Sequence, residues 1–207
     1  TDVMYCIFLG RAIQSTVPAT NSITAAMVGN DLISGKDALT VSPAATDEIL
    51  LSDAGTLKRT DVSVFGNAPA FKVTLSGNQT IADDTLTRVT WDTEEYDTNS
   101  AFASNIFTVP SGEGGKYVFE FHVFGDDIDD ADVWSTYLEL DGTEVAGSIG
   151  EKRGVSGTNN CPMNNTVTVT CTAGQTIEVV TKHQGTSASQ EIRSNNSFFS
   201  GYKLIGV

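Results

Sequence analysis

The clearest hydrophobic pattern in the chain lies between Phe107 and Phe124. Pro110 and a group of three glycines separate a short extended segment from the stretch that begins at Tyr117. In that stretch the apolar side chains recur with a period of two, which predicts a β-strand and not a helix. Aromatic side chains occur on both faces of this strand. We therefore expect one face to line a sandwich core and the other to meet a further subunit.

From residue 71 to the end of the chain, short segments with strand-like hydrophobic patterns are separated by turn residues. This arrangement is typical of an all-β sandwich. The predicted strands are 71–75, 87–91, 105–109, 117–124, 134–140, 144–149, 166–171, 176–182 and 198–205. Asp141-Gly142 predicts a tight hairpin between two neighbouring strands. The Ser-, Thr-, Asn- and Gly-rich residues 150–165 predict a long surface loop.

The first 70 residues contain few large hydrophobic side chains and cannot build a core of their own. Residues 47–62 predict a hairpin with its turn at Asp53-Ala54-Gly55. We expect two domains: an anchoring and stem region at 1–70, with little regular structure and several copies wrapped together, and a sandwich head at 71–207. An apolar run at 3–9 has no head domain to enter, so it predicts burial against a partner. The candidate anchoring residues are Tyr5, Ile7, Phe8 and Leu9.

Charge excludes two classes of partner. The 207-residue chain has a net charge of −14, and its twelve Lys and Arg residues are scattered. Nucleic acid and anionic membranes would be repelled. The run at 3–9 lacks a preceding basic region and is too short to span a bilayer, so neither a signal peptide nor a membrane anchor is expected. Residues 71–207 hold 19 acidic and 8 basic residues, which predicts that the head is the solvated end.

Candidate chemistry is sparse. The acidic run at 126–132 offers oxygen ligands to calcium, but it lacks the glycine and the distal glutamate of a calcium loop, so a solvated loop and no cofactor are expected. Its calcium candidates are Asp126, Asp127, Asp129, Asp130 and Asp132. His122 is expected in a core strand and His183 just before a loop. The three cysteines, at 6, 161 and 171, are expected to be idle thiols, with a Cys161–Cys171 bridge as the alternative.

No catalytic motif occurs, so the chain is expected not to be an enzyme. Glu94 and Glu95 could serve a glycan-cleaving reaction, but adjacent strand residues point to opposite faces, whereas that reaction needs two converging carboxyl groups. Trp91 and Trp134 lie on predicted strands, where burial in the core is favoured over stacking on a sugar.

Several segments resemble, in the same order, parts of the complement C1q globular head, a jelly roll shared with the tumour necrosis factor superfamily. They are Ala70-Phe-Lys-Val73, Tyr96-Asp97, Phe107-Thr-Val-Pro110, Tyr117-x-Phe-x-Phe121, Leu138-Glu-Leu-Asp-Gly-Thr143, Ala173-Gly-Gln175 and Phe199-Ser-Gly-Tyr-Lys-Leu204. The resemblance covers residues 70–207 and implies a homotrimeric jelly-roll head. It departs at Val109, where the family often has a cysteine. The candidates for the core or the threefold contact are Tyr117, Phe119, Phe121, Phe199 and Tyr202.

The segment from Asp47 to Arg59 resembles one that recurs in the stalks of fibre and appendage proteins of tailed bacteriophages. Together the two resemblances imply a non-enzymatic, homotrimeric protein of the virion surface, assembled in the host cytoplasm. A capsid decoration or cement protein would dock its stem on the major capsid protein or another virion structural protein.

The alternative is a receptor-binding tail fibre or fibre tip that recognises a host surface glycan or protein. Decoration is preferred because Thr1 would follow a removable initiator Met, and 70 residues before the head are short for a fibre. A cellular lectin would ordinarily need a secretion signal.

Overall fold

Strand β9 (Gly115–Asp126) is a central strand of its sheet. Its side chains alternate between an apolar side that is buried and a mixed side that is partly exposed. The computed structural model describes residues 35–44, 46–65, 69–126, 128–155, 160–186 and 188–205. Along β9, Tyr117, Phe119, Phe121 and Val123 are fully buried. The strand pairs with β13 (Asn160–Cys171) along one edge and with β16 (Phe198–Lys203) along the other. The predicted strand at 117–124 is confirmed, and it extends by two residues at each end.

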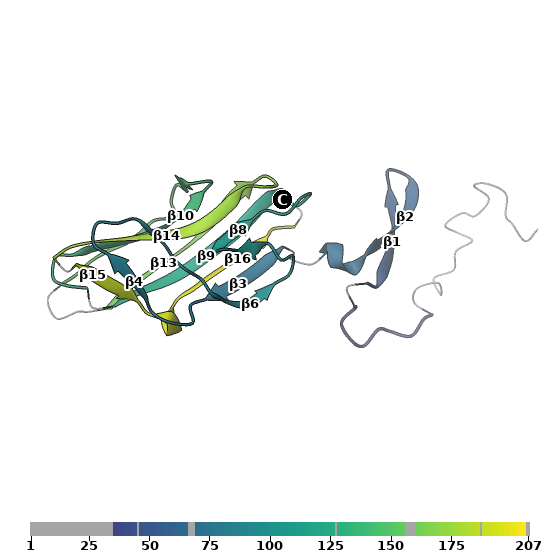
Figure 1. Cartoon of the computed structure of the whole chain (residues 1–207). Helices are drawn as coiled ribbons and strands as arrows, with labels where there is room; N and C mark the ends of the chain where they lie inside the picture. Colours follow the sequence, from purple (N-terminus) through teal and green to yellow (C-terminus); the bar gives the residue numbers. More distant parts are fainter. Residues whose placement is uncertain are drawn as a thin grey trace, which may run out of the picture. The chain divides into compact units, whose positions relative to one another are not determined.

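Two seven-stranded sheets pack face to face (Figure 1). The β9 sheet contains β3 (Ala70–Thr74), β4 (Gln79–Ala82), β6 (Thr93–Asp97), β9, β13, β15 (Ser189–Ile192) and β16. The β14 sheet contains β5 (Thr87–Arg88), β7 (Phe102–Ala103), β8 (Ile106–Thr108), β10 (Val133–Leu140), β11 (Thr143–Glu144), β12 (Gly150–Arg153) and β14 (Thr176–Gln184). A short 3-10 helix, η4 (Ser194–Asn196), separates β15 from β16.

The order of the strands is that of a jelly roll. The principal strands of the β9 sheet follow the order β3-β16-β9-β13, and those of the other sheet follow β8-β14-β10-β12. From β8 onward the chain crosses repeatedly between the sheets, and all the strand pairs within them are antiparallel. The predicted all-β jelly-roll head is therefore confirmed.

Aromatic side chains fill the space between the sheets. The Phe71 ring centroid lies 4.7 Å from that of Phe107 and 4.9 Å from that of Phe199. Gly201 lets β16 approach this group closely, since a Cβ atom there would lie only 2.5 Å from the Phe119 ring. Trp91 and Trp134 are also buried, as predicted. The core therefore joins side chains from both sheets into one hydrophobic cluster.

Before the sandwich lies a hairpin of β1 (Glu48–Asp53) and β2 (Thr56–Asp61), followed by the 3-10 helix η3 (Val62–Phe65). Ala54 and Gly55 both have positive φ, which is the backbone of a tight hairpin turn. The predicted hairpin is confirmed. The chain divides into two units between Pro43 and Ala44. The sandwich begins at Ala70, and the functional division into 1–70 and 71–207 stays a prediction.

Two predictions for the middle of the head are wrong. The segment predicted as a strand at 144–149 continues β11 only at Glu144 and then forms turns. The predicted loop at 150–165 instead contains β12 and the first half of β13. Its polar residues misled the prediction because Asn and Thr side chains occupy the outward positions of β13, while Cys161 and Met163 face the core. Strands β4, β6, β7 and β15, all short, were not predicted.

Candidate functional site

The side of the β9 sheet that faces away from the core carries an unusual set of apolar side chains. We define the outer face by Val118, His122, Phe124, Phe198 and Tyr202. Strand register places Tyr202 beside Val118, and Phe198 beside His122. Tyr202 is 39% exposed, and the other four side chains are partly buried. The solvent side of an antiparallel sheet ordinarily carries polar residues, so this face is suited to contact with another surface.

Two cations cover the aromatic rings of the outer face. Lys72 Nζ lies 5.6 Å from the centroid of the Phe198 ring and 2.9 Å from Glu95 Oε2. At the far end of β9, the Arg193 guanidinium lies 5.4 Å from the centroid of the Phe124 ring and pairs with Asp126. Each cation therefore contacts both a ring and a carboxylate. The outer face combines aromatic surface with balanced charge.

Beside Phe198 the outer face is hollowed into a groove of about 430 Å³. The lining of the groove is mostly polar: the Lys72–Glu95 pair supplies charge, and residues 194–197 supply hydroxyl and amide groups. His122 and Phe198 add two rings. The groove brings together side chains from β3, β6, β9, η4 and β16. None of these residues except Glu95 and His122 was considered from the sequence. The only local signal was the run Ser194-Asn-Asn-Ser197, which is typical of a turn.

Hydrogen bonds hold the turn that borders the groove. The backbone N–H of Ser194 donates to Asn78 Oδ1 at 3.1 Å. Ser197 Oγ donates to the carbonyl of Arg193 at 2.7 Å and accepts from the N–H of Phe124 at 3.0 Å. The turn is therefore tied both to the loop before β4 and to β9. Such ties keep a binding surface in one conformation before a ligand arrives.

The candidates for the core or the threefold contact divide between the two sides of the sheet. Tyr117, Phe119, Phe121 and Phe199 lie in the core. Tyr202 reaches the outer face. Of these candidates, only Tyr202 can touch a second copy of the chain without unfolding of the sandwich. The anchoring candidates Tyr5, Ile7, Phe8 and Leu9 lie outside the described residues, and their role stays a prediction.

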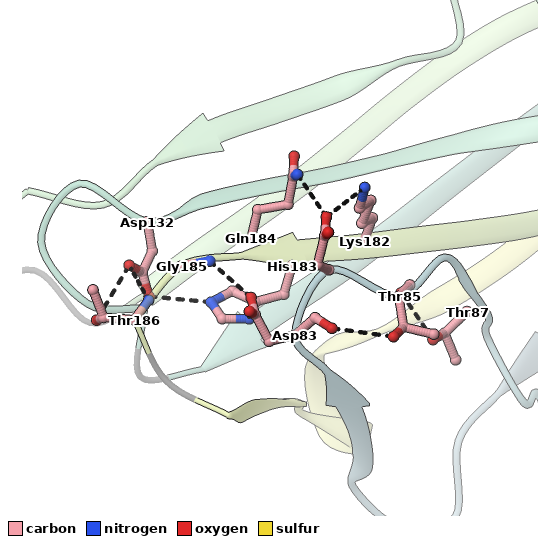
Figure 2. Close-up of polar contacts among 10 residues, drawn as sticks. Asp83, Thr85, Thr87, Asp132, Lys182, His183, Gln184, Gly185 and Thr186 are labelled. Carbon is pink, nitrogen blue, oxygen red and sulfur yellow. Dashed lines mark hydrogen bonds and ion pairs between the residues drawn. The ribbon is translucent and has the colours of Figure 1, made fainter.

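His122 lies in a core strand and His183 lies just before a loop, as predicted, but the structure decides which of the two rings is covered. His122 lies on the outer face, and its ring contacts those of Phe124 and Phe198. His183 is fully buried near the end of β14. Figure 2 shows its ring between two carboxylates: Nε2 donates to Asp132 Oδ2 at 3.1 Å, and Nδ1 lies 3.5 Å from Asp83 Oδ1. The period of two places a residue on a face but does not say which face is covered.

The His183 cluster joins the two sheets at one end of the sandwich. Asp83 directly follows β4, whereas Asp132 precedes β10 and His183 belongs to β14. Asp132 also accepts from the backbone N–H of Thr186 at 3.0 Å. A Cβ atom on Gly185 would lie 1.9 Å from the Asp132 carboxyl carbon, so only glycine fits there. We assign this cluster a structural role because the His183 and Asp132 side chains that form its hydrogen bond are both buried.

The acidic run does not form a metal centre among the residues that can be placed. Asp126 pairs with Arg193, Asp132 is buried against His183, and Asp129 and Asp130 are exposed. Asp127 lies outside the described residues. In the described ranges, no three His, Cys, Asp or Glu side chains form a group that could hold a metal ion. Asp126 and Asp132 therefore serve the fold, one in an ion pair and the other as a buried hydrogen-bond acceptor.

Cys161 and Cys171 are free thiols, and the strand that carries them explains why. They stand at opposite ends of β13, ten residues or roughly 33 Å apart at the rise of an extended strand. A disulfide requires Cα atoms within about 7 Å. Burial raises the pKa of each thiol to about 11, so both are protonated at neutral pH and are poor nucleophiles. Cys6 lies outside the described residues.

Glu94 and Glu95 are both exposed on β6, and Glu95 is held by Lys72. No helix within the described ranges is long and apolar enough to cross a membrane.

Comparisons with known proteins find solved structures of low sequence identity and no sequence family. The sequence matches no protein-family model and no curated protein. The globular domain of zebrafish complement 1qA protein gives a TM-score of 0.49 at 15% identity, covering 66% of this chain and 97% of that one. Eiger TNF from S. frugiperda gives 0.48 at 15% identity, covering 67% and 93%. Murine APRIL gives 0.49 at 14% identity, covering 65% and 98%. The jelly-roll assignment itself rests on the strand order of this chain.

Proposed function

We propose that this chain is a non-enzymatic, homotrimeric surface protein of a tailed-bacteriophage virion, and that it decorates the capsid. In this proposal the sandwich is the solvated head, and the residues before it form a stem that docks on the major capsid protein or another virion structural protein. The observation that carries the proposal is the apolar outer face of the β9 sheet. A single copy leaves Tyr202 and its neighbour Val118, at one end of that face, against water. Association of three copies through this end would cover both side chains and leave the His122–Phe198 end of the face accessible.

The hairpin before the sandwich supports a stem made of several copies. Leu50 is 67% exposed and Leu57 is 68% exposed, although both are large apolar residues. A two-stranded hairpin is marginally stable by itself in water. Packing three hairpins together would bury these leucines, at a gain of about 1.5 to 3 kcal/mol for each side chain fully removed from water. The sequence resemblance of this segment to phage stalk segments agrees with that role.

The trimer is tested by the mass of the protein in solution. At micromolar concentration, light scattering should give three times the 21.9 kDa mass of the chain. Tyr202→Glu places a charge in the proposed contact and should shift the population toward monomers. Leu86→Glu is the control, because Leu86 is also an exposed large apolar residue, at 47% against 39% for Tyr202, but lies between β4 and β5. A well-folded wild-type monomer would reject the trimer.

Docking by the stem is tested with a deletion of residues 1–10. The truncated protein should still form a trimer, because the head and the hairpin remain, but it should no longer bind particles. Occupancy can be measured by electron microscopy of particles incubated with the purified protein. Binding at wild-type occupancy would place the anchor elsewhere, with the β1–β2 hairpin as the next candidate.

A receptor-binding tail fibre is the second candidate function, and the groove beside Phe198 favours it. Polar side chains converge there on a hollow of the size that small ligands occupy. Electron microscopy of labelled virions separates the two candidates, since a label on the capsid indicates decoration and a label on the tail indicates a fibre.

A further inference from the structure

We propose that the groove beside Phe198 binds one neutral sugar residue of a glycan. For its biological role this inference rests on the receptor-binding function proposed above, whereas the groove itself belongs to the sandwich of a single chain. The argument uses the volume of the groove, its charge, its free polar groups and its rigidity.

The volume suits a small ligand. Pockets for small molecules typically enclose about 300 to 1,000 Å³. At about 430 Å³, the groove lies at the lower end of that range, which is enough for one pyranose ring and part of the next. Its position on the outer face leaves one side open, so a longer chain of sugars can continue out of it.

The charge of the groove favours a neutral ligand. Lys72 and Glu95 neutralise one another at 2.9 Å, and the neighbouring cation Arg193 is paired with Asp126. A phosphate or carboxylate ligand would therefore have to displace a carboxylate. The net charge of −14 on the chain also repels acidic ligands. Phosphorylated and sialylated ligands are disfavoured on both grounds.

Two amide side chains are available to hydroxyl groups. Asn195 and Asn196 are exposed, and neither side chain has a hydrogen-bond partner within the described part of the chain. An amide presents one acceptor and two donor hydrogens in a fixed plane. Adjacent hydroxyl groups of a sugar also act as both donors and acceptors, so one amide can satisfy two of them. Glu95 and Lys72 add a charged acceptor and a charged donor, which form the stronger bonds.

Two rings complete the site. The rings of Phe198 and His122 lie 6.1 Å apart at 63° to each other, and both residues line the groove. The C–H groups on one face of a pyranose ring can pack on such surface while its hydroxyl groups reach the amides. The hydrogen bonds that hold residues 194–197 fix these groups before binding, which lowers the entropic cost of association.

The test uses the full-length protein and a panel of small probes. The probes are the methyl glycosides of glucose, galactose and mannose, N-acetylglucosamine, and N-acetylneuraminic acid as the charged comparison. Saturation-transfer NMR and backbone chemical shifts should detect at least one neutral probe at residues 194–198, with a Kd on the order of 1 mM. Asn196→Ala and Glu95→Gln should each weaken binding roughly tenfold.

Glu113→Gln is the matched control. This variant loses the ion pair between Lys203 Nζ and Glu113 Oε2, which are 2.8 Å apart at the other end of the sheet. It should bind the probe as the wild type does. The proposal is overturned if no neutral probe perturbs residues 194–198, if both groove variants bind at wild-type strength, or if the acidic sugar binds more tightly. If no sugar binds but the protein is a trimer on the capsid, the sugar site is rejected and the proposed function stands. If a sugar binds but the protein is a monomer, the trimer is rejected and the sugar site stands.

Discussion

His183 is a buried polar residue whose replacement should lower stability. In His183→Leu, Asp132 loses the donor at 3.1 Å while its carboxylate stays buried at 2% exposure. A buried carboxylate deprived of its partner costs about 2 to 4 kcal/mol. We expect the urea midpoint to fall accordingly. His122→Leu is the control, and it should change the free energy of unfolding by less than about 1 kcal/mol. The His122 ring is partly buried, and the contacts it makes with described residues are those with the Phe124 and Phe198 rings. Equal effects of the two variants would contradict the structural role of His183.

Gly201 marks the point of closest approach between β16 and the core. In Gly201→Ala the new Cβ would lie 2.5 Å from the Phe119 ring and 2.8 Å from the Phe71 ring. Overpacking of this kind costs about 1 to 3 kcal/mol, which chemical denaturation can measure. Adding Phe119→Leu should restore part of the loss by freeing space. A single variant as stable as the wild type would mean that the two rings can move aside at no cost.

At the scale of elements, the β10–β11 turn is locked to the start of β14 by one side chain. Asp141 has a φ of 51° and accepts from the N–H of Thr176 at 2.8 Å and from Gln175 Nε2 at 2.9 Å. The hydrogen bond from Thr176, then that from Gln175, lowers the pKa of Asp141. A lowered carboxyl pKa stabilises the fold above the unfolded pKa, near 3.9, and that stability is lost as the pH falls through the folded pKa.

Asp141→Asn should therefore reduce the melting temperature at pH 5 while keeping the turn, since asparagine also tolerates positive φ. The difference from wild type should shrink as the pH is lowered from 5 to 2, as measured by thermal unfolding. A difference that stays constant over this range would show that the charge of Asp141 is not what stabilises the turn.

Three strands of the β14 sheet place glutamates directly opposite one another. Glu139 on β10 faces Glu144 on β11 and Glu178 on β14, and Arg88 forms an ion pair with Glu178. Burial first, and then the Glu178 carboxylate, raise the pKa of Glu139, although Arg88 opposes this. The folded state therefore holds this proton more tightly, and stability falls as the pH rises from the unfolded pKa through the folded pKa.

Glu139→Gln removes this repulsion and should stabilise the protein at pH 7 by about 0.5 to 1 kcal/mol. At pH 3 no gain is expected, because the wild-type carboxyl group is then protonated. Glu151→Gln, at an exposed position of β12, is the control and should change little at either pH. Destabilisation by Glu139→Gln at pH 7 would mean that the carboxylate contributes a net attraction to Arg88.

At the scale of the whole molecule, charge predicts which end faces solvent on a particle. Residues 71–207 hold 19 acidic and 8 basic residues, against 7 and 4 before them. Acidic heads repel one another and stay soluble when closely spaced. We expect antibody fragments raised against the sandwich to bind intact particles and to appear as outward density in electron microscopy. A head that these fragments cannot reach on the particle would contradict the proposed orientation.

Alternating segments and turn residues were sufficient to predict most of the sandwich. The strands at 71–75, 117–124, 134–140 and 176–182 were predicted because large apolar side chains recur there with a period of two. The turns at Ala54-Gly55 and Asp141-Gly142 were predicted because few residues tolerate positive φ. The first half of β13 was missed because only its inward residues are apolar, and the outward Asn and Thr side chains resemble those of a loop.

Local sequence by itself therefore determined the class of the fold, the central strands and the tight turns, because these depend on neighbours within a few residues. Only the tertiary structure decided that His183 is buried while His122 lies on the outer face, since the alternation of a strand does not identify its covered side. The existence of the groove also depends on the tertiary structure. Lys72, Glu95, His122 and residues 194–198 are far apart in the chain, and they meet because β3, β6, β9 and β16 are neighbours in one sheet.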